Sequence, residues 1–210
     1  MGAFSSAAYW DTRYRAGGNS GAGSFGRLAR YKAGVVNGLI EANKVASMID
    51  LGCGDAAQLA LLRLPAAYTG VDVSPAALAL CAVRHPSLRF AAPEALDSIP
   101  PAELTISMDV LYHLVEDEVF DAMLRTLFDW STRFVAIYAS NADVGWTSPH
   151  VRHRCFTDRI AAMRSAWRLL AHVPNPFPYH PARPTETSFS DFYIYGKAGT
   201  GCVLKIPALV

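Results

Sequence analysis

Residues 45–55 read VASMIDLGCGD, an apolar run that ends in a turn with two glycines one residue apart. The run from 45 to 51 has the length and apolar character of a buried strand, and residues 56–64 have helical spacing. A strand, a glycine turn and a helix in this order begin a βαβ unit. Because Gly52 and Gly54 lack side chains, their backbone can lie close against a ligand at the end of the strand.

Strand and helix patterns continue to alternate along the chain. The spacing of apolar residues predicts helices over 25–43, 74–86, 116–130 and 157–166, and strands over 68–73, 88–91, 104–108, 134–139, 167–173 and 189–195. Ser74 followed by Pro75 is typical of an N-cap with proline at the first helical position. The sequence therefore predicts an α/β fold with a doubly wound, mostly parallel seven-stranded sheet and an antiparallel final strand.

The chain divides into two parts by composition. Residues 1–24 are rich in aromatic residues, glycine and serine, and we expect them to form an N-terminal helical lid or arm. Residues 25–210 hold the alternating pattern and are expected to form one domain.

The composition excludes several classes of protein. The 210 residues are 51% hydrophobic and 18% charged, with a formal net charge of +1, which argues against a nucleic-acid partner bound through many phosphates. No apolar run is long enough to span a membrane, and the N-terminus lacks the pattern of a secretory signal. The four cysteines are scattered, without disulfide or zinc-ligand spacing. We expect a cytoplasmic protein, monomeric or homodimeric, with no membrane partner and no metal.

Charge distinguishes between two possible cofactors. Gly52, Gly54 and Ala57 loosely satisfy the dinucleotide pattern, but Asp50 and Asp55 flank the glycines. Two carboxylates beside a pyrophosphate would cost on the order of a few kcal/mol. They suit instead a ligand with an ammonium and a sulfonium, which S-adenosylmethionine carries. Asp72 ends the second strand and can accept hydrogen bonds from ribose hydroxyls in either cofactor.

Three segments resemble a known family. Residues 45–55, 68–74 (YTGVDVS) and 107–114 (SMDVLYHL) are similar to the first, second and fourth motifs of class I S-adenosylmethionine-dependent methyltransferases. Residues 9–29 are similar to the start of a subgroup of small bacterial members. The resemblance implies a Rossmann-like methyltransferase fold and methyl transfer. Residues 91–94 (AAPE) lack the family's Gly-Asp pair, so we expect backbone contacts to adenine there.

The motifs and the arm together give the expected cofactor site. Its residues are Asp50, Gly52, Cys53, Gly54, Asp55, Asp72, Val73, Pro93, Glu94, Asp109 and Val110, with Trp10 and Tyr14 from the lid. An aromatic face from the lid would interact favourably with a sulfonium and exclude water. The alternative is that these aromatic residues only anchor the arm.

The candidate residues for catalysis and acceptor binding follow the fourth and fifth strands. His113 is the candidate base, with Tyr112 beside it; the alternatives are a structural histidine and a packing tyrosine. Residues 149–154 read PHVRHR, and His150, Arg152, His153 and Arg154 would suit an acceptor that bears a carboxylate or phosphate. A solvated basic turn is the alternative for this cluster.

These observations predict an S-adenosylmethionine-dependent methyltransferase that acts on an oxygen or nitrogen of a small-molecule acceptor. Too little sequence is inserted between the strands to form a separate acceptor domain. Two alternatives remain at this point: an NAD-linked oxidoreductase, and a methyltransferase-like module that holds the cofactor without turnover.

Overall fold

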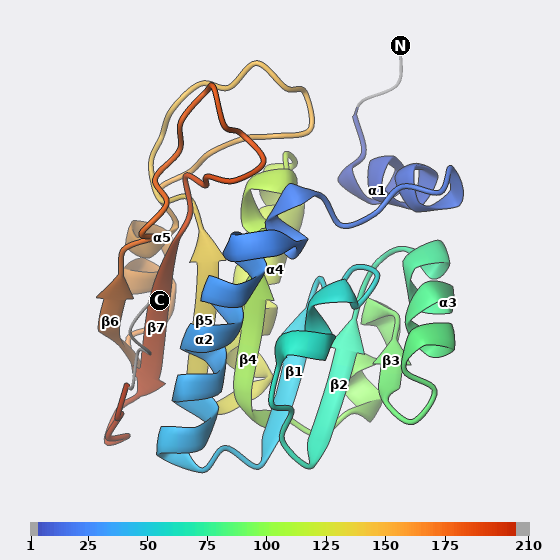
Figure 1. The fold of residues 1–210 in the computed structure, drawn as a ribbon. Coiled ribbons are helices and arrows are strands. Elements are labelled where there is room, and N and C mark those ends of the chain that lie inside the picture. The colour runs from blue at the N-terminus through green and yellow to red at the C-terminus, as the bar shows by residue number, and fades with distance from the viewer. Residues whose placement is uncertain (1–3, 205–210) are drawn as a thin grey trace.

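The computed structural model describes residues 4–204, which form a seven-stranded sheet with helices on both faces (Figure 1). The strands are β1 (Ser47–Leu51), β2 (Ala67–Val71), β3 (Arg89–Ala91), β4 (Ala102–Met108), β5 (Ser131–Ala139), β6 (Trp167–Val173) and β7 (Asp191–Lys197). The helices are α1 (Ser6–Arg15), α2 (Gly26–Asn43), α3 (Pro75–Arg84), α4 (Asp117–Asp129) and α5 (Phe156–Met163). Residues 1–3 of the expected arm and 205–210 of the expected domain lie outside the described residues.

The strand order is β3-β2-β1-β4-β5-β7-β6. The final strand, β7, is antiparallel to both of its neighbours, β5 and β6, while β1 to β5 pair in parallel. The predicted mostly parallel sheet with an antiparallel final strand is confirmed. Because the chain order reverses between β1 and β4, a crevice is expected beyond their carboxyl ends.

Two hydrophobic layers cover the sheet. On one face, α2 packs Val35, Val36 and Leu39 against alternate residues of β1, β4 and β5, and α3 adds Cys81. On the other face, α4 and α5 pack Phe120, Leu124 and other apolar side chains against the opposite set of residues in the same strands. The sheet is therefore buried on both sides, as parallel sheets usually are.

The segment after the glycine turn differs from its prediction. A helix was expected over residues 56–64, but only a short 3₁₀ turn, Ala57–Leu61, forms there. Ala56 before it has a left-handed backbone (φ 56°), and Pro65 disfavours helical conformation in the residue that precedes it. Too few residues remain between these two points for a stable α-helix. The predicted cap of α3 is confirmed, since the Ser74 hydroxyl accepts a hydrogen bond from the Ala77 amide.

Helix α1 and the 3₁₀ turn Ala22–Ser24 make up most of the described arm, and α1 lies beyond the carboxyl ends of the strands (Figure 1). The division of the chain into an arm and a single domain stays a prediction. None of the helices within residues 4–204 combines the length and apolar character needed to cross a membrane.

A buried ion pair joins α2 to the end of β4. The Lys32 ammonium lies 2.5 Å from Oδ2 of Asp109, and the lysine side chain is completely buried. Asp109 itself has a left-handed backbone (φ 62°), which aspartate tolerates better than most residues. The side chain of Lys32 also lies over the ring of Tyr138, with 5.4 Å between the ammonium nitrogen and the ring centroid.

Lys32→Met should lower the free energy of unfolding by about 3–5 kcal/mol, because it leaves a carboxylate without its buried counter-charge. Arg63→Met is the matched control: it breaks the exposed pair with Glu41 and should cost less than about 1 kcal/mol. Urea denaturation followed by tryptophan fluorescence measures both values. Adding Asp109→Asn to Lys32→Met should recover part of the loss. Equal losses for the two single variants would contradict a structural role for the pair.

Candidate active site

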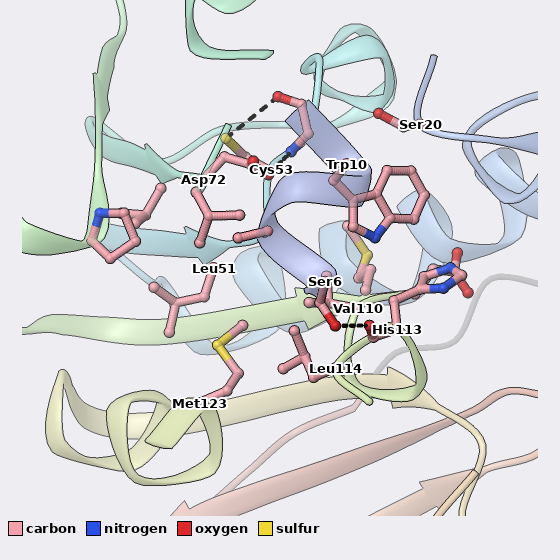
Figure 2. Close-up of a pocket in the computed structure, with 18 of the residues that line it drawn as sticks. Ser6, Trp10, Ser20, Leu51, Cys53, Asp72, Val110, His113, Leu114 and Met123 are labelled. Atoms are coloured by element: carbon pink, nitrogen blue, oxygen red, sulfur yellow. Dashed lines mark hydrogen bonds between the residues drawn. The ribbon is translucent and has the colours of Figure 1, made fainter. Parts of the chain in front are cut away.

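A cavity of about 260 Å³ lies at the carboxyl ends of β1, β2 and β4, beneath α1 (Figure 2). Its lining brings together most of the residues predicted to bind a cofactor, and also the candidate base. These are Trp10, Tyr14, Gly52, Cys53, Gly54, Asp72, Val73, Pro93, Asp109, Val110 and His113. The predicted residues that do not line it are Asp50, Asp55, Glu94, Tyr112, His150, Arg152, His153 and Arg154.

The glycine turn forms the inner wall of this cavity. Gly52 and Gly54 both have left-handed backbones, with φ 84° and 57°. A Cβ atom at Gly54 would lie 2.7 Å from the Tyr14 hydroxyl and closer still to the Ser20 hydroxyl. Glycine is therefore required at position 54 by the arm that packs against the turn, as well as by the backbone conformation.

Asp72 is fixed beside the turn by two backbone amides. Its Oδ2 accepts a hydrogen bond from the Gly54 amide and its Oδ1 accepts one from the Ser74 amide, both at 2.9 Å. Burial raises the pKa of Asp72, and the backbone hydrogen bonds oppose that shift. A carboxylate has about four lone-pair sites, so about two remain for a ligand in the cavity.

The other two carboxylates of the glycine turn, Asp50 and Asp55, have partners elsewhere and do not line the cavity, so their predicted contact with a cofactor stays a prediction. Side chains alternate along a strand, so Asp50 faces the α2 layer with Met48 and accepts a hydrogen bond from Tyr68. Burial raises the pKa of Asp50 to about 7. Asp55 accepts a hydrogen bond from Ser20 and pairs with Arg84 at 2.9 Å. The negative charge on the cavity wall therefore comes from Asp72 and Asp109.

The basic run, residues 149–154, also lies outside the lining of the cavity. Arg152 and Arg154 each contact a carboxylate oxygen of Asp117 at 3.1 Å, and Arg154 donates to the carbonyl oxygens of Leu114 and Val115 at 2.7 Å. These guanidinium groups stabilise the start of α4 because its acidic first turn and the preceding carbonyls attract them. Neither arginine lines the cavity, and their predicted role in binding an acceptor stays a prediction.

The two histidines of the run have structural contacts too. His150 stacks on Tyr9 of α1, with 4.6 Å between ring centroids. Nδ1 of His153 lies 2.6 Å from the Ser140 hydroxyl, and burial lowers the pKa of His153. Glu94 is exposed beside Pro93, and Tyr112 donates a hydrogen bond to Oδ1 of Asp109 at 2.9 Å.

His113 is held as a neutral imidazole at the edge of the cavity. Nδ1 lies 3.0 Å from the His150 carbonyl oxygen, which can only accept, so Nδ1 carries the proton and Nε2 has a free lone pair. The edge of the Trp10 ring meets the His113 ring, with 4.8 Å between centroids (Figure 2). Burial lowers the pKa of His113 to about 4.

Helix α1 covers the cavity and is anchored on both sides. The Ser6 amide donates to Glu116 at 2.8 Å, and the Ser6 hydroxyl contacts Glu116 and the His113 carbonyl oxygen. On the other side, Asp11 accepts a hydrogen bond at 2.8 Å from Ser74, the cap of α3. The helix therefore spans the gap between the starts of α4 and α3.

Several residues of the cavity lining, and the Asp11 anchor of α1, were not predicted. Ser6 and Asp11 carry no motif, and their roles depend on contacts with residues more than sixty positions away. The apolar lining from α4 comes from a segment that was predicted from the sequence only as a helix. The unpredicted lining residues include Ser6, Ser20, Ser24, Gln58, Leu96, Met108, Leu114, Val119 and Met123.

Comparison with known proteins supports the fold. No family model and no curated protein matches the sequence. The N-methyltransferase NodS from Bradyrhizobium japonicum WM9, solved with S-adenosyl-L-homocysteine, is 15% identical, with 92% of this chain and 98% of that chain covered and a TM-score of 0.66. Magnesium protoporphyrin IX methyltransferase from Synechocystis PCC 6803, with bound SAM, is 15% identical, with coverages of 94% and 100% and a TM-score of 0.64.

A third similar structure is longer. The mitomycin 7-O-methyltransferase MmcR is 14% identical, with a TM-score of 0.58, and the match covers 82% of this chain and 55% of that protein. This chain thus matches about half the length of that enzyme. The class I methyltransferase fold expected from the motifs is confirmed by these three structures.

The protonation state of His113 is directly measurable. Long-range ¹H–¹⁵N correlation spectra should show the proton on Nδ1 at pH 6, and a titration midpoint near pH 4 instead of 6.5, because burial disfavours the cation. The same histidines in urea-unfolded protein serve as the control. A midpoint at pH 6 or above, or a proton on Nε2, would contradict the geometry described for His113.

Proposed function

We propose that this protein is an S-adenosylmethionine-dependent methyltransferase that acts on an oxygen or nitrogen of a small-molecule acceptor. The observation that carries the proposal is the position of Asp72. Two backbone amides fix its carboxylate, which keeps free lone pairs. It lines a cavity beside the point where strand order reverses. A nucleoside with two ribose hydroxyls fits this carboxylate. Two of the similar structures contain SAM or S-adenosylhomocysteine.

The glycine turn does not suit the pyrophosphate of NAD. A pyrophosphate binds to free amides at a helix N-terminus. Here the Asp55 amide donates to the Ser20 hydroxyl, and the Ala57 amide donates to the Asp55 carboxylate. The helix is replaced by a short 3₁₀ turn. These contacts favour a cofactor without phosphate over the oxidoreductase alternative.

The remaining lining residues fit the other parts of S-adenosylmethionine. The apolar side chains of Pro93 and Leu96 offer a surface for adenine. Asp109 and Gly52 also line the cavity and would suit the amino acid end of the cofactor. The ring of Trp10 faces the cavity from α1 (Figure 2). When bound, the cofactor would supply a sulfonium-activated methyl group. The chain's own contribution is alignment and exclusion of water, with α1 as the cover.

His113 is the base in this proposal. Its neutral Nε2 can accept a proton from a hydroxyl or ammonium acceptor, and the Nδ1 hydrogen bond fixes the ring in that orientation. A small-molecule acceptor fits the short connections between the core strands. A cytoplasmic location and a monomeric or homodimeric state are part of the proposal, and the four free cysteines are compatible with a reducing compartment.

Asp72→Ala should weaken binding of S-adenosylhomocysteine about 10- to 100-fold in isothermal calorimetry, because the ribose loses its hydrogen-bond acceptor. Glu94→Ala is the matched control: Glu94 precedes Leu96 in the same segment but does not line the cavity, so affinity should stay unchanged. If the two variants bind equally well, Asp72 does not hold the ligand. Saturable binding of NADH without binding of S-adenosylhomocysteine would reverse the choice of cofactor.

His113→Gln should reduce turnover about 10²- to 10⁴-fold and change affinity for S-adenosylhomocysteine by less than about threefold, as expected for loss of a general base. Turnover is followed by transfer of isotopically labelled methyl groups across a panel of amines and hydroxyl compounds. His172→Gln, at the exposed far edge of the sheet, is the control. Parallel losses of turnover and affinity would point to a structural histidine. Tight cofactor binding with no transfer to any acceptor would favour the non-catalytic module.

A further inference from the structure

A second cavity, of about 110 Å³, also has Asp109 in its lining. Asp109 belongs to the lining of both cavities, so its carboxylate forms part of a shared wall. The full lining of the second cavity is Gly23, Leu28, Asp109, Tyr112, Tyr179, Pro184, Thr187, Ser188 and Phe189. Its volume equals that of roughly four water molecules at about 30 Å³ each, which suits a molecule with only a few non-hydrogen atoms.

The charged group in the lining of this second cavity is a carboxylate. Asp109 is the charged residue among the described residues that line it, and no lysine, arginine or histidine is part of that lining. The partner of Asp109, Lys32, is completely buried and lines neither cavity. Lys32 and Tyr112 each occupy one lone pair of the carboxylate, so about two of its four sites remain for a donor on a ligand.

Aromatic rings form another part of the wall. Phe189 packs against Tyr112 with 4.8 Å between ring centroids, and against Tyr179 with 6.0 Å. Trp146 supports Tyr179 from outside the cavity, with centroids 5.3 Å apart. Aromatic faces and a carboxylate around a small space are the combination that stabilises an ammonium ion.

The loop that carries two of these rings is held in place before any ligand binds. Arg27 of α2 donates to the Glu186 carbonyl oxygen at 2.6 Å, and the Thr187 hydroxyl donates to the Arg183 carbonyl oxygen at 2.6 Å. The Asn175 side chain donates to the carbonyl oxygens of Phe177 and Ser188. Because these contacts fix the backbone around Tyr179 and Phe189, a ligand would not have to order the loop.

We propose that this second cavity is the acceptor subsite and that it takes a small aliphatic amine. The assignment to an acceptor rests on the proposed methyl transfer. The amine nitrogen would form a bond to the methyl carbon while the electron pair of the broken carbon–sulfur bond stays on sulfur, and the nitrogen would gain the positive charge that sulfur loses. The acceptor would therefore react as a neutral amine, after any ammonium form has lost a proton to solvent, and the product would leave as an ammonium. The anionic acceptor suggested by the basic run has no cationic group to meet it in this cavity.

The test uses tetramethylammonium chloride as the probe, with tert-butanol as a neutral compound of the same number of non-hydrogen atoms and sodium acetate as an anion. Binding to the full chain is measured by ligand-observed NMR titration with S-adenosylhomocysteine present. Tetramethylammonium should bind saturably and at least tenfold more tightly than tert-butanol or acetate. Tyr179→Leu should weaken it at least tenfold, and Tyr179→Phe, which keeps the ring, should retain it.

Tyr179 does not line the first cavity, so Tyr179→Leu should leave the affinity for S-adenosylhomocysteine unchanged. Asp109→Asn should also weaken tetramethylammonium binding. It removes the partner of Lys32, however, and if this variant does not fold, the comparison of Tyr179→Leu with Tyr179→Phe decides the outcome. No saturable binding, equal affinity for tert-butanol, tighter binding of acetate, or no effect of Tyr179→Leu would overturn the amine site. Failure of the wild-type chain to bind S-adenosylhomocysteine, with amine selectivity intact, would overturn the proposed function and the acceptor role but not the amine site.

Discussion

The buried pair between Lys32 and Asp109 is the interaction on which the arrangement of the site depends. A fully buried ammonium needs a counter-charge, and the carboxylate that supplies it stands at the end of β4 in a left-handed backbone conformation. The pair ties α2 to the edge of the sheet where the chain order reverses. It also fixes the one carboxylate that faces both cavities. The need of the buried Lys32 for a counter-charge therefore sets the position of the Asp109 carboxylate in the site.

The N-terminal arm completes the site because its residues form the part of the cavity wall that the sheet does not supply. Ser20 and Tyr14 fill the space against Gly54, while Ser6 and Asp11 attach α1 to the starts of two different helices. These contacts are hydrogen bonds with few buried apolar groups, so the cover can separate from the sheet at lower cost than a core helix could.

The fold and part of the site could be predicted from the sequence because they depend on local patterns. Strand periodicity, the two glycines and the carboxylate of Asp72 each follow from spacing along the chain. The direction of Asp50 and the partner of Asp55 could not be predicted in this way. Asp50 faces the α2 layer by strand alternation, and Asp55 meets Arg84 from α3, a contact that exists only after the helix packs. The contacts of Arg152 and Arg154 with Asp117 and with the carbonyl groups before α4 could not be predicted either, because they too form only after the chain folds.

Charge conservation links the two cavities. In the proposed reaction the positive charge starts on a sulfonium in the first cavity and ends on the amine nitrogen in the second. A carboxylate in the shared wall is close to the charge in both states, so its electrostatic stabilisation changes little as the charge moves. Lys32 holds that carboxylate in place from the side that faces neither cavity. An acceptor that starts as an anion would instead be repelled by the same carboxylate, which is why the geometry favours a neutral amine that becomes a cation.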